Sequence, residues 1–551
     1  MSPTSRSLDR VAEESFGVAA LRPEQRRAME AVLDGRDVLL VLPSGAGKSL
    51  VYQVPTVFLP GPTVVVSPLI ALQRDQLGHL ADDPDAPEAV AVHSAQPGAE
   101  SDRALRSVRR GEAEYLFLSP EQLADPRTVD RMRRAEPSLF VVDEAHCVSD
   151  WGHDFRPDYL RLRHAVEELG RPPVLAATAT ASGPVRDDIV GHLGMVDPVR
   201  VVTGFDRPNL FLAATRITDD TQRHDIVRDR VLAGPTPGLV YAPTRADTET
   251  FAAELAEHGV SVAAFHAGLP AKERRRVQDA FTRGGVDVVV ATSAFGMGID
   301  KPDVRFVVHT APPDSLDSYY QQIGRAGRDG GRAEALLIHR ADDFDLQRFL
   351  TAGSFDEDKV AEVADTVAEY DGTATPTELD HDVDQSHRST MGNLGLLERA
   401  GIVGTAPDGG LTVTDPDTPP ARAAAGQFER RRELDRSRIA VLREYAETAA
   451  CRRQFLLGYF GERLAHPCGD CDTCAAGTAG AHAPPADDDV EFDVGTRVRH
   501  RQWGRGTVAT READRLTVLF DEGGYRTLAL SSVRQGGLLT PAGDEGAADD
   551  G

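Results

Sequence analysis

The sequence contains few residues of several kinds, and each shortage excludes a class of protein. Its 551 residues include only five cysteines, too few for a disulfide framework. No run approaches the roughly 18 apolar residues that a transmembrane helix requires. The first 16 residues also lack the apolar stretch of a secretory signal. We therefore expect a cytoplasmic protein with no membrane partner.

Positive charge is also scarce. Lysine and arginine total 61 against 87 aspartates and glutamates, which gives a net charge of −26. This balance argues against attraction of the whole surface to nucleic acid, but it says little about local patches. Basic clusters do occur, at residues 106–110, 131–134, 272–276 and 428–434. Only 4 of the basic residues are lysines, so a lysine inside a motif, such as Lys48, is informative.

The segment "DVLLVLPSGAGKSLVYQVP" (37–55) predicts an apolar strand, a glycine loop and a helix. Gly45 and Gly47 would let backbone N–H groups approach phosphate oxygens. Lys48 would reach the β and γ phosphates of a nucleotide, and the Ser49 hydroxyl would ligate Mg²⁺. The pattern indicates a relaxed P-loop. The alternative is a glycine-rich turn that carries a surface lysine.

A second segment, "SLFVVDEAHC" (138–147), places two carboxylates directly after an apolar strand. Asp143 would hold Mg²⁺, and Glu144 would orient or deprotonate the attacking water. The alternative is a solvated acidic turn after a strand. Because a P-loop needs an acidic partner at the end of a neighbouring strand, the two motifs together favour ATP hydrolysis.

With these motifs the chain resembles superfamily 2 helicases, and the RecQ family in particular. "FGVAALRPEQ" (16–25) is similar to the adenine-reading motif of that family, which implies that Arg22 and Gln25 contact adenine. The resemblance also adds His146 to the catalytic set. It covers about residues 10 to 345 and implies DNA as substrate, single-stranded or partly duplex, with 3′ to 5′ movement. Further helicase motifs follow in order at residues 64–76, 116–123, 175–181 and 205–210.

Alternating strand and helix patterns after residue 206 predict a second parallel-sheet domain. Its segment "SYYQQIGRAGRDG" (318–330) carries Arg325 and Arg328, which we expect on one helix face because they are three residues apart. Arginines facing the P-loop would stabilise charge on the γ-phosphate, and the resemblance favours Arg328 in this role. The alternative is a pair of surface arginines. With ATP bound between two such lobes, hydrolysis would open and close the cleft and drive translocation.

An aromatic loop follows the carboxylates directly. Trp151, one of only two tryptophans, is followed by Phe155 and Arg156. Aromatic faces stack bases with about 1–3 kcal/mol each, and arginine binds phosphate. In the RecQ family this loop is assigned the coupling of DNA binding to hydrolysis. The alternative is that both aromatic residues belong to the core.

Four of the five cysteines lie close together, with the spacing C-x16-C-x2-C-x2-C. Four thiolates at such spacing in a cytosolic protein suit tetrahedral Zn²⁺. The cluster resembles the RecQ zinc module, and redox thiols are the alternative. The predicted ligands are Cys451, Cys468, Cys471 and Cys474.

Between the second lobe and the cysteines the chain departs from the family pattern. About 75 residues, 352–426, read as helices over 358–369, 376–382 and 386–400, followed by two short strands around a glycine turn. This order predicts a winged helix, and a structural spacer is the alternative.

After a linker, the C-terminal segment alternates apolar and polar residues, which predicts a small β-barrel. It resembles the Tudor-like module of UvrD/PcrA helicases, which implies a contact with RNA polymerase. A nucleic-acid-binding or purely stabilising barrel is the alternative. The residues expected to line the barrel are Val508, Leu516, Val518, Phe520, Leu528 and Leu530.

The sequence therefore predicts a multidomain α/β protein, an ATP-dependent DNA helicase of DNA repair or recombination. It would use ATP, Mg²⁺ and Zn²⁺ and lie in the cytoplasm with the nucleoid. A nucleic-acid translocase or an RNA helicase with the same ATPase lobes is one alternative, and a non-catalytic DNA-bound adaptor is another. The predicted parts are two RecA-like lobes (1–206 and 207–350), the winged-helix-like insert (352–426), the zinc module (427–476), a linker (477–489), the barrel (490–540) and a disordered acidic tail (541–551).

Overall fold

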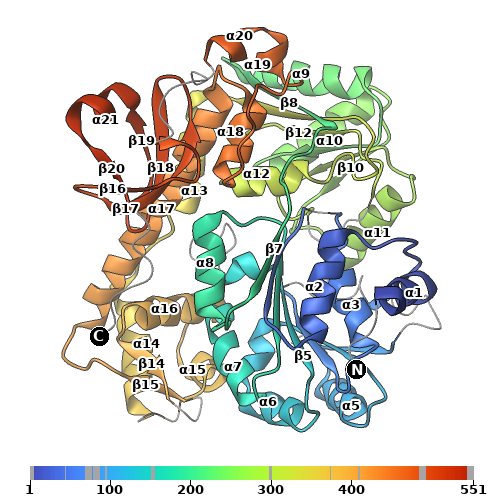
Figure 1. Ribbon diagram of the computed structural model, residues 1–551, viewed down its shortest axis with the longest axis vertical. Helices are drawn as coiled ribbons and strands as arrows, with labels where there is room; N and C mark the ends of the chain where they lie inside the picture. The colour runs from blue at the N-terminus through green and yellow to red at the C-terminus, as the bar shows by residue number, and fades with distance from the viewer. Residues whose placement is uncertain are drawn as a thin grey trace. The chain divides into compact units, whose positions relative to one another are not determined.

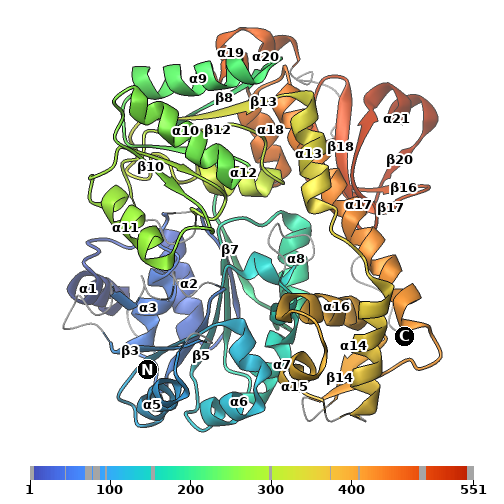
Figure 2. The same cartoon turned by 180° about the vertical axis from the view of Figure 1, so that it is seen from behind.

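The fold is taken from a computed structural model of the chain (Figures 1 and 2). It divides the chain into two compact units, each made of two separate stretches of sequence. Unit 1 comprises residues 1–203 and 354–431, and unit 2 comprises residues 204–353 and 432–551. The structure describes residues 5–43, 45–68, 73, 77–78, 87–93, 96–149, 156–296, 301–370, 372, 374–406, 410–482 and 492–542.

Unit 1 contains a parallel sheet of seven strands, which confirms the first predicted α/β lobe. The strands are short apolar runs buried on both faces, as parallel strands covered by helices require. In spatial order they are β3 (Ala89–Val92), β4 (Tyr115–Leu118), β2 (Thr63–Val66), β5 (Leu139–Asp143), β6 (Val174–Thr178), β1 (Val38–Val41) and β7 (Val199–Val202). The α-helices are α1 (Ser5–Phe16), α2 (Pro23–Leu33), α3 (Leu50–Thr56), α5 (Gly98–Arg109), α6 (Pro126–Arg133), α7 (Leu162–Glu168) and α8 (Gly183–His192). Three 3₁₀ helices are η1 (Pro120–Ala124), η2 (Ala145–Val148) and η3 (Pro157–Arg161).

The insert between the second lobe and the cysteines also belongs to unit 1. Its helices are α14 (Glu357–Glu369), α15 (Pro376–Asp382) and α16 (His387–Arg399), within one or two residues of the predicted ranges. An antiparallel pair, β14 (Val403–Thr405) and β15 (Leu411–Val413), follows them. The insert has a hydrophobic core of its own. It packs through α16 against η3, where Arg161 Nη2 lies 3.2 Å from Glu398 Oε1.

Unit 2 contains the second lobe, a parallel sheet of six strands. In spatial order the strands are β10 (Val262–Phe265), β11 (Val288–Ala291), β9 (Gly238–Tyr241), β12 (Phe306–His309), β13 (Ala333–His339) and β8 (Leu210–Arg216). The helices of this lobe are α9 (Asp220–Ala233), α10 (Arg245–Glu257), α11 (Ala271–Thr282), α12 (Leu316–Ile323) and α13 (Ala341–Thr351). The two sheets confirm the prediction of two RecA-like lobes.

A long helix, α17 (Pro420–Glu447), crosses the boundary between the two stretches at residues 431 and 432. It leads to α18 (Arg452–Tyr459) and to the cysteine loop with α19 (Asp472–Ala475) and α20 (Thr478–Ala481). Arg453 of α18 donates a hydrogen bond to the Leu210 carbonyl oxygen at 2.6 Å, so the helical hairpin formed by α17 and α18 is fastened to the second lobe.

The C-terminal segment forms a five-stranded antiparallel sheet, here called the C-terminal sheet (residues 492–542), which lies beside α17 in Figure 1. Of the residues predicted to line it, Val508, Leu516, Val518, Phe520 and Leu530 are buried in its core, and Leu528 is partly buried against that core. Leu530 begins a helix and is not in a strand. The elements are β16 (Arg497–His500), β17 (Gly504–Arg511), β18 (Arg515–Phe520), β19 (Gly524–Ala529), α21 (Leu530–Gly536) and β20 (Leu539–Pro541).

None of the helices in the described ranges is long and apolar enough to cross a membrane. Residues 483–489 of the predicted linker, residues 490–491 of the predicted barrel and residues 543–551 of the predicted tail lie outside those ranges.

A buried histidine in β12 makes the stability of unit 2 depend on pH. His309 is 1% exposed, lies 2.6 Å (Nε2) from Gln322 Oε1 and stacks on Tyr241. Burial lowers the pKa of His309 to about 4, and the hydrogen bond to Gln322 opposes this shift. The unfolded chain binds this proton near pH 6.5. The stability is therefore complete above that value and falls as the pH drops towards 4.

We expect unit 2 to lose about 2 kcal/mol of unfolding free energy between pH 7 and pH 5 because of this one group. Urea unfolding at several pH values measures the slope. In His309→Asn the new side chain does not titrate. The dependence of the unfolding free energy on pH should therefore become flatter at pH values above the range in which carboxylates titrate. An unchanged slope in the variant would assign the pH dependence to other groups.

Candidate active site and metal centre

The P-loop lies at the carboxyl end of β1, which is next to β6 in the sheet, and β5 lies on the other side of β6. Gly45 and Gly47 both have positive φ angles, 77° and 76°, which only glycine adopts without strain. The Leu42 N–H donates to the Thr178 carbonyl oxygen at 3.1 Å, so the loop entry is tied to β6. Lys48 Nζ donates to the Leu42 carbonyl oxygen at 3.3 Å. The predicted strand, glycine loop and helix are all present, with Ser49 directly before α3.

Gln25 of α2 fixes the P-loop backbone through hydrogen bonds of its side-chain amide. Its Nε2 donates to the carbonyl oxygens of Ala46 at 3.0 Å and Gly47 at 3.2 Å, while its Oε1 accepts from the Arg22 N–H at 2.9 Å. A Cβ on Gly47 would lie 2.6 Å from Gln25 Nε2, so a side chain there would displace the Gln25 amide from the loop. The sequence did not predict this role, because nothing in residues 16–25 shows which backbone groups the amide reaches.

The two carboxylates lie at the end of β5, where Asp143 is buried and Glu144 is mostly buried. Glu144 has a left-handed backbone (φ 49°), and its N–H donates to Asp143 Oδ1 at 3.0 Å. Burial first, and the neighbouring Glu144 charge second, raise the pKa of Asp143 to about 7, while Lys48 acts in the opposite direction. A carboxylate this costly to ionise suits a site that receives a cation.

His146 connects the carboxylates to β6. Its Nδ1 lies 3.0 Å from Thr178 Oγ1 and 3.3 Å from Glu144 Oε2. Tyr159 of η3 donates its hydroxyl to the Asp143 carbonyl oxygen at 3.4 Å. The structure therefore gathers Lys48, the two carboxylates and His146 around three neighbouring strand ends.

Of the predicted aromatic loop, only Arg156 lies within the described residues; Trp151 and Phe155 lie outside them. Arg156 is half-buried, and its Nη1 donates to the Pro68 carbonyl oxygen at 3.0 Å. Its N–H donates to the Cys147 carbonyl oxygen at 3.0 Å, which fixes the end of the loop against η2.

The helical placement of Arg325 and Arg328 is wrong. Helix α12 ends at Ile323, and residues 324–329 form successive turns with Gly327 at φ 59°. The glycines of "GRAGR" end the helix, because they leave little side-chain surface to pack and allow the left-handed turn. Arg325 is buried against the Tyr241 hydroxyl, while Arg328 is half-buried and donates to the Gly324 carbonyl oxygen at 3.5 Å.

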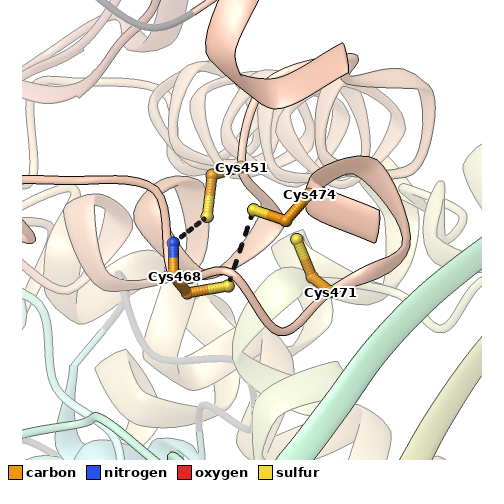
Figure 3. Close-up of side chains that lie close together, drawn as sticks. All are labelled: Cys451, Cys468, Cys471 and Cys474. Atoms are coloured by element: carbon orange, nitrogen blue, oxygen red, sulfur yellow. Dashed lines mark hydrogen bonds between the residues drawn. The ribbon is translucent and has the colours of Figure 1, made fainter. Parts of the chain in front are cut away.

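The four predicted cysteines converge at the end of the helical hairpin (Figure 3). Their sulfur atoms all lie within 4.8 Å of one another, and the Sγ atoms of Cys468 and Cys474 are 3.9 Å apart. Sulfurs that bind one tetrahedral Zn²⁺ at 2.3 Å are separated by about 3.8 Å. The Cys468 N–H donates to Cys451 Sγ at 3.2 Å, the kind of contact that stabilises a metal-bound thiolate. The four donors therefore fit zinc.

The comparisons with known proteins agree with this geometry. The DEAD/DEAH box helicase pattern matches residues 22–189, the helicase conserved C-terminal domain matches residues 226–330, and the RecQ zinc-binding pattern matches residues 421–475. The chain is 38% identical over 350 residues to the probable ATP-dependent DNA helicase RecS of Bacillus subtilis, covering 63% of this chain and 70% of that protein. It is 30% identical over 498 residues to the ATP-dependent DNA helicase RecQ of the same bacterium, covering 90% and 71%. The chain belongs to the RecQ helicase family.

Other RecQ relatives are longer than this chain. The chain is 33% identical to the ATP-dependent DNA helicase RecQ of Pasteurella multocida and covers 61% of that protein and 83% of itself. Among solved structures, it matches the Mycobacterium smegmatis helicase Lhr, bound to single-stranded DNA and AMP-PNP, with a TM-score of 0.52, 20% identity and coverage of 79% of this chain and 62% of that one. It matches the DUF1998 helicase MrfA, bound to DNA and AMPPNP, with a TM-score of 0.54, 19% identity and coverage of 76% and 63%. At these identities the structures support the fold alone.

In this RecQ-family chain the cysteine loop is docked on the second lobe, a contact that the cysteine spacing did not predict. Asp472 Oδ2 accepts from the Ala214 N–H of β8 at 2.9 Å, and its Oδ1 accepts from Arg452 Nε at 2.6 Å. Arg332 and Asp470 form a two-pronged ion pair, with both N–O distances 2.7 Å. Residues of the cysteine loop therefore join the helical hairpin to the second lobe at β8.

Proposed function

We propose that the protein is an ATP-dependent DNA helicase that separates duplex DNA by moving along one strand from 3′ to 5′, in DNA repair or recombination. The observation that supports this most is the meeting of Lys48, Asp143, Glu144 and His146 at neighbouring strand ends in a RecQ-family chain. The direction of movement comes from the family resemblance. We place the protein in the cytoplasm with the nucleoid.

In this proposal each residue of the P-loop lobe has a defined task. Lys48 and the backbone around Gly45 and Gly47 hold the triphosphate, with Arg22 and Gln25 near the adenine. Ser49 and Asp143 hold Mg²⁺, which supplies charge neutralisation on the phosphates when bound.

Glu144 orients the attacking water and accepts its proton, and His146 fixes the Glu144 side chain against Thr178. Arg328 takes the arginine-finger role, with Arg325 holding the turn next to Tyr241.

Zinc, held by the four cysteines, stabilises the hairpin on the second lobe, since structural sites of this kind contribute folding energy. Trp151, Phe155 and Arg156 contact the DNA strand. The loop that carries them couples DNA binding to hydrolysis at Glu144. Tyr159 supports that path, because it joins η3 to the Asp143 carbonyl group.

We further infer that residues 352–426 adopt a winged-helix arrangement and that residues 490–540 close into a small barrel. Three helices followed by an antiparallel pair support the first assignment. The insert has 15 acidic residues against 4 basic ones, a balance that disfavours contact with DNA phosphates. Its contact with η3 instead suggests that it positions the segment after the aromatic loop.

The decisive experiment measures ATP hydrolysis without nucleic acid, with single-stranded DNA and with RNA, and unwinding of duplexes that carry a 3′ or a 5′ tail. We expect stimulation by DNA and unwinding of the 3′-tailed duplex only. Equal stimulation by RNA would favour an RNA helicase, and stimulation without unwinding would favour a translocase. ATP binding without turnover would favour the adaptor. Lys48→Ala is the control and should lose hydrolysis under all conditions.

Gln25→Ala should raise the KM for ATP by about 10-fold, because it leaves the carbonyl groups of Ala46 and Gly47 and the Arg22 N–H without their partner. Gln25→Glu is the matched control: it keeps the acceptor for Arg22 but cannot donate to the loop, and it should show the same increase. Because Gln25 acts on the loop as well as near the adenine, the KM for GTP should also rise, although by less than the KM for ATP. An unchanged KM for GTP would assign Gln25 to adenine alone.

The Arg161–Glu398 pair tests the positioning role of the insert. The two side chains are only 14% and 15% exposed, so Arg161→Glu or Glu398→Arg should weaken docking of the insert by about 2–4 kcal/mol. We expect DNA stimulation of hydrolysis to fall several-fold in either variant while basal hydrolysis is kept. The double exchange, Arg161→Glu with Glu398→Arg, should recover much of the stimulation. Full stimulation in both single variants would exclude this coupling.

A further inference from the structure

The C-terminal sheet is basic in a strongly acidic chain. Its 51 described residues contain eight arginines and five acidic residues, whereas the whole chain carries a net charge of −26. Four of these arginines, Arg497, Arg499, Arg501 and Arg505, are exposed and lie on the β16–β17 hairpin. We call these four side chains the arginine hairpin.

Strand geometry puts three of the four arginines on one face. Val498 and His500 are buried, so the alternate positions Arg497 and Arg499 point away from the core. Arg499 is directly opposite Arg505 in the antiparallel register. Like charges directly opposite on neighbouring strands destabilise a sheet. An arrangement that costs stability in the free protein is explained if an anion lies over this face.

Of the three arginines on this face, Arg497 has a carboxylate partner, whereas Arg499 and Arg505 form no ion pair with a described residue. Glu512 and Asp514 pair with Arg515, Asp493 pairs with Arg463, and Asp521 lies 3.5 Å from Arg497. Within the ranges that the structure describes, the side chains of Arg499, Arg501 and Arg505 form no ion pair. Three guanidinium groups thus remain available on one short hairpin.

The hairpin turn is also held in one conformation. His500 Nδ1 accepts from the N–H groups of Gln502 at 3.1 Å and Trp503 at 3.3 Å, which requires that nitrogen to be unprotonated. The Trp503 ring stacks on His500 with centroids 4.1 Å apart and packs against the sheet core. Because the indole is used in this way, the hairpin offers charge and not a free stacking surface for bases.

We propose that the arginine hairpin binds the phosphodiester backbone of DNA, independently of base sequence, as an anchor additional to the helicase lobes. Exposed guanidinium groups without carboxylate partners suit phosphates, which accept two hydrogen bonds from one arginine. A protein surface complementary to this hairpin would need a matching row of carboxylates, whereas DNA supplies one phosphate after another. The inference rests on the proposed DNA helicase function.

The test compares the full chain with a variant in which Arg499, Arg501 and Arg505 are all replaced by Gln. Binding of a tailed duplex is measured by fluorescence anisotropy from 50 to 300 mM salt, without nucleotide. Each lost phosphate contact should reduce the slope of log K against log salt by about 0.9. We expect the slope to fall by about 2–3 and the affinity at 50 mM salt to fall about 10- to 100-fold.

Two controls separate charge from folding and position. Replacing the same three arginines by Lys keeps the charge and should keep most of the slope. Arg534→Gln removes an arginine from α21 of the same sheet and should change neither value. Because the Gln variant also removes a like-charge pair, its melting temperature should equal or exceed that of the wild type.

The outcomes distinguish this inference from the proposed function. If the Gln variant binds DNA with the wild-type affinity and slope while DNA still stimulates ATP hydrolysis, the arginine hairpin is not a DNA anchor. If the variant instead loses binding to purified RNA polymerase and keeps DNA binding, the occupant is protein and the inference is overturned. If DNA does not stimulate the wild type at all, it is the helicase assignment that fails.

Discussion

Glu144→Gln should reduce ATP hydrolysis by about 10²–10⁴-fold, the range expected for loss of a catalytic base. The amide cannot accept the proton of the attacking water, yet it keeps the size of the side chain and an oxygen facing His146. The left-handed backbone at this position is equally available to both residues. Steady-state turnover with saturating DNA is the measurement.

ATP binding should persist in Glu144→Gln and should be lost in Lys48→Ala. Removing the Glu144 charge also removes a cause of the raised pKa of Asp143, so the remaining carboxylate is easier to ionise and holds a cation at least as well. Fluorescent nucleotide titration distinguishes the two variants. Wild-type turnover in Glu144→Gln would show that another group activates the water.

Loss of zinc should have the second large effect. Cys471→Ser should abolish the bound zinc and destabilise unit 2 by about 4 kcal/mol or more, because the metal supplies folding energy to the loop. Cys471 is fully buried, and its backbone forms an isolated β-bridge with Leu212 of β8. Loss of the metal should therefore also weaken the docking of the helical hairpin on the second lobe. Metal analysis and thermal unfolding measure the two effects.

Cys147→Ser is the matched control, since Cys147 is equally buried but lies in η2 of unit 1 and is not one of the four clustered cysteines. It should keep one zinc per chain. A chelator added to the wild type should reproduce the melting behaviour of Cys471→Ser. If the chelated protein melts as the untreated one does, the four thiols have a redox or packing role instead.

Local signals predicted the elements that local physics controls. The helix over residues 376–382 is capped by Thr375, whose hydroxyl accepts from the Glu378 N–H at 3.2 Å, while the Glu378 carboxylate accepts from the Thr375 N–H at 3.0 Å. Ser386 caps the following helix in a similar way. The P-loop strand and the cysteine cluster were predictable for the same reason, because their residues are close in sequence.

Contacts between distant segments were not predictable. The Gln25 clamp joins residues more than 20 positions apart, and the bond from Thr517 to Glu444 that holds the C-terminal sheet on α17 spans 73 positions. Periodicity marks a side chain as polar or apolar but does not identify its partner. The two arginines after α12 show the opposite error: spacing alone suggested a helix face, while residues 324–329 form turns around Gly324 and Gly327.

The division of the chain into two units, each made of two stretches, has a consequence for synthesis. Neither unit has its complete sequence when the first 353 residues have left the ribosome, because unit 1 still lacks residues 354–431 and unit 2 lacks residues 432–551. The first lobe is synthesised before the insert that packs on η3. Helix α17 then contains both the last residues of unit 1 and the first residues of the second stretch of unit 2. Ribosomes that stop before residue 431 therefore release chains in which both units are unfinished. A protease that cuts the chain at one of its three passages between the units leaves the units joined by the other two.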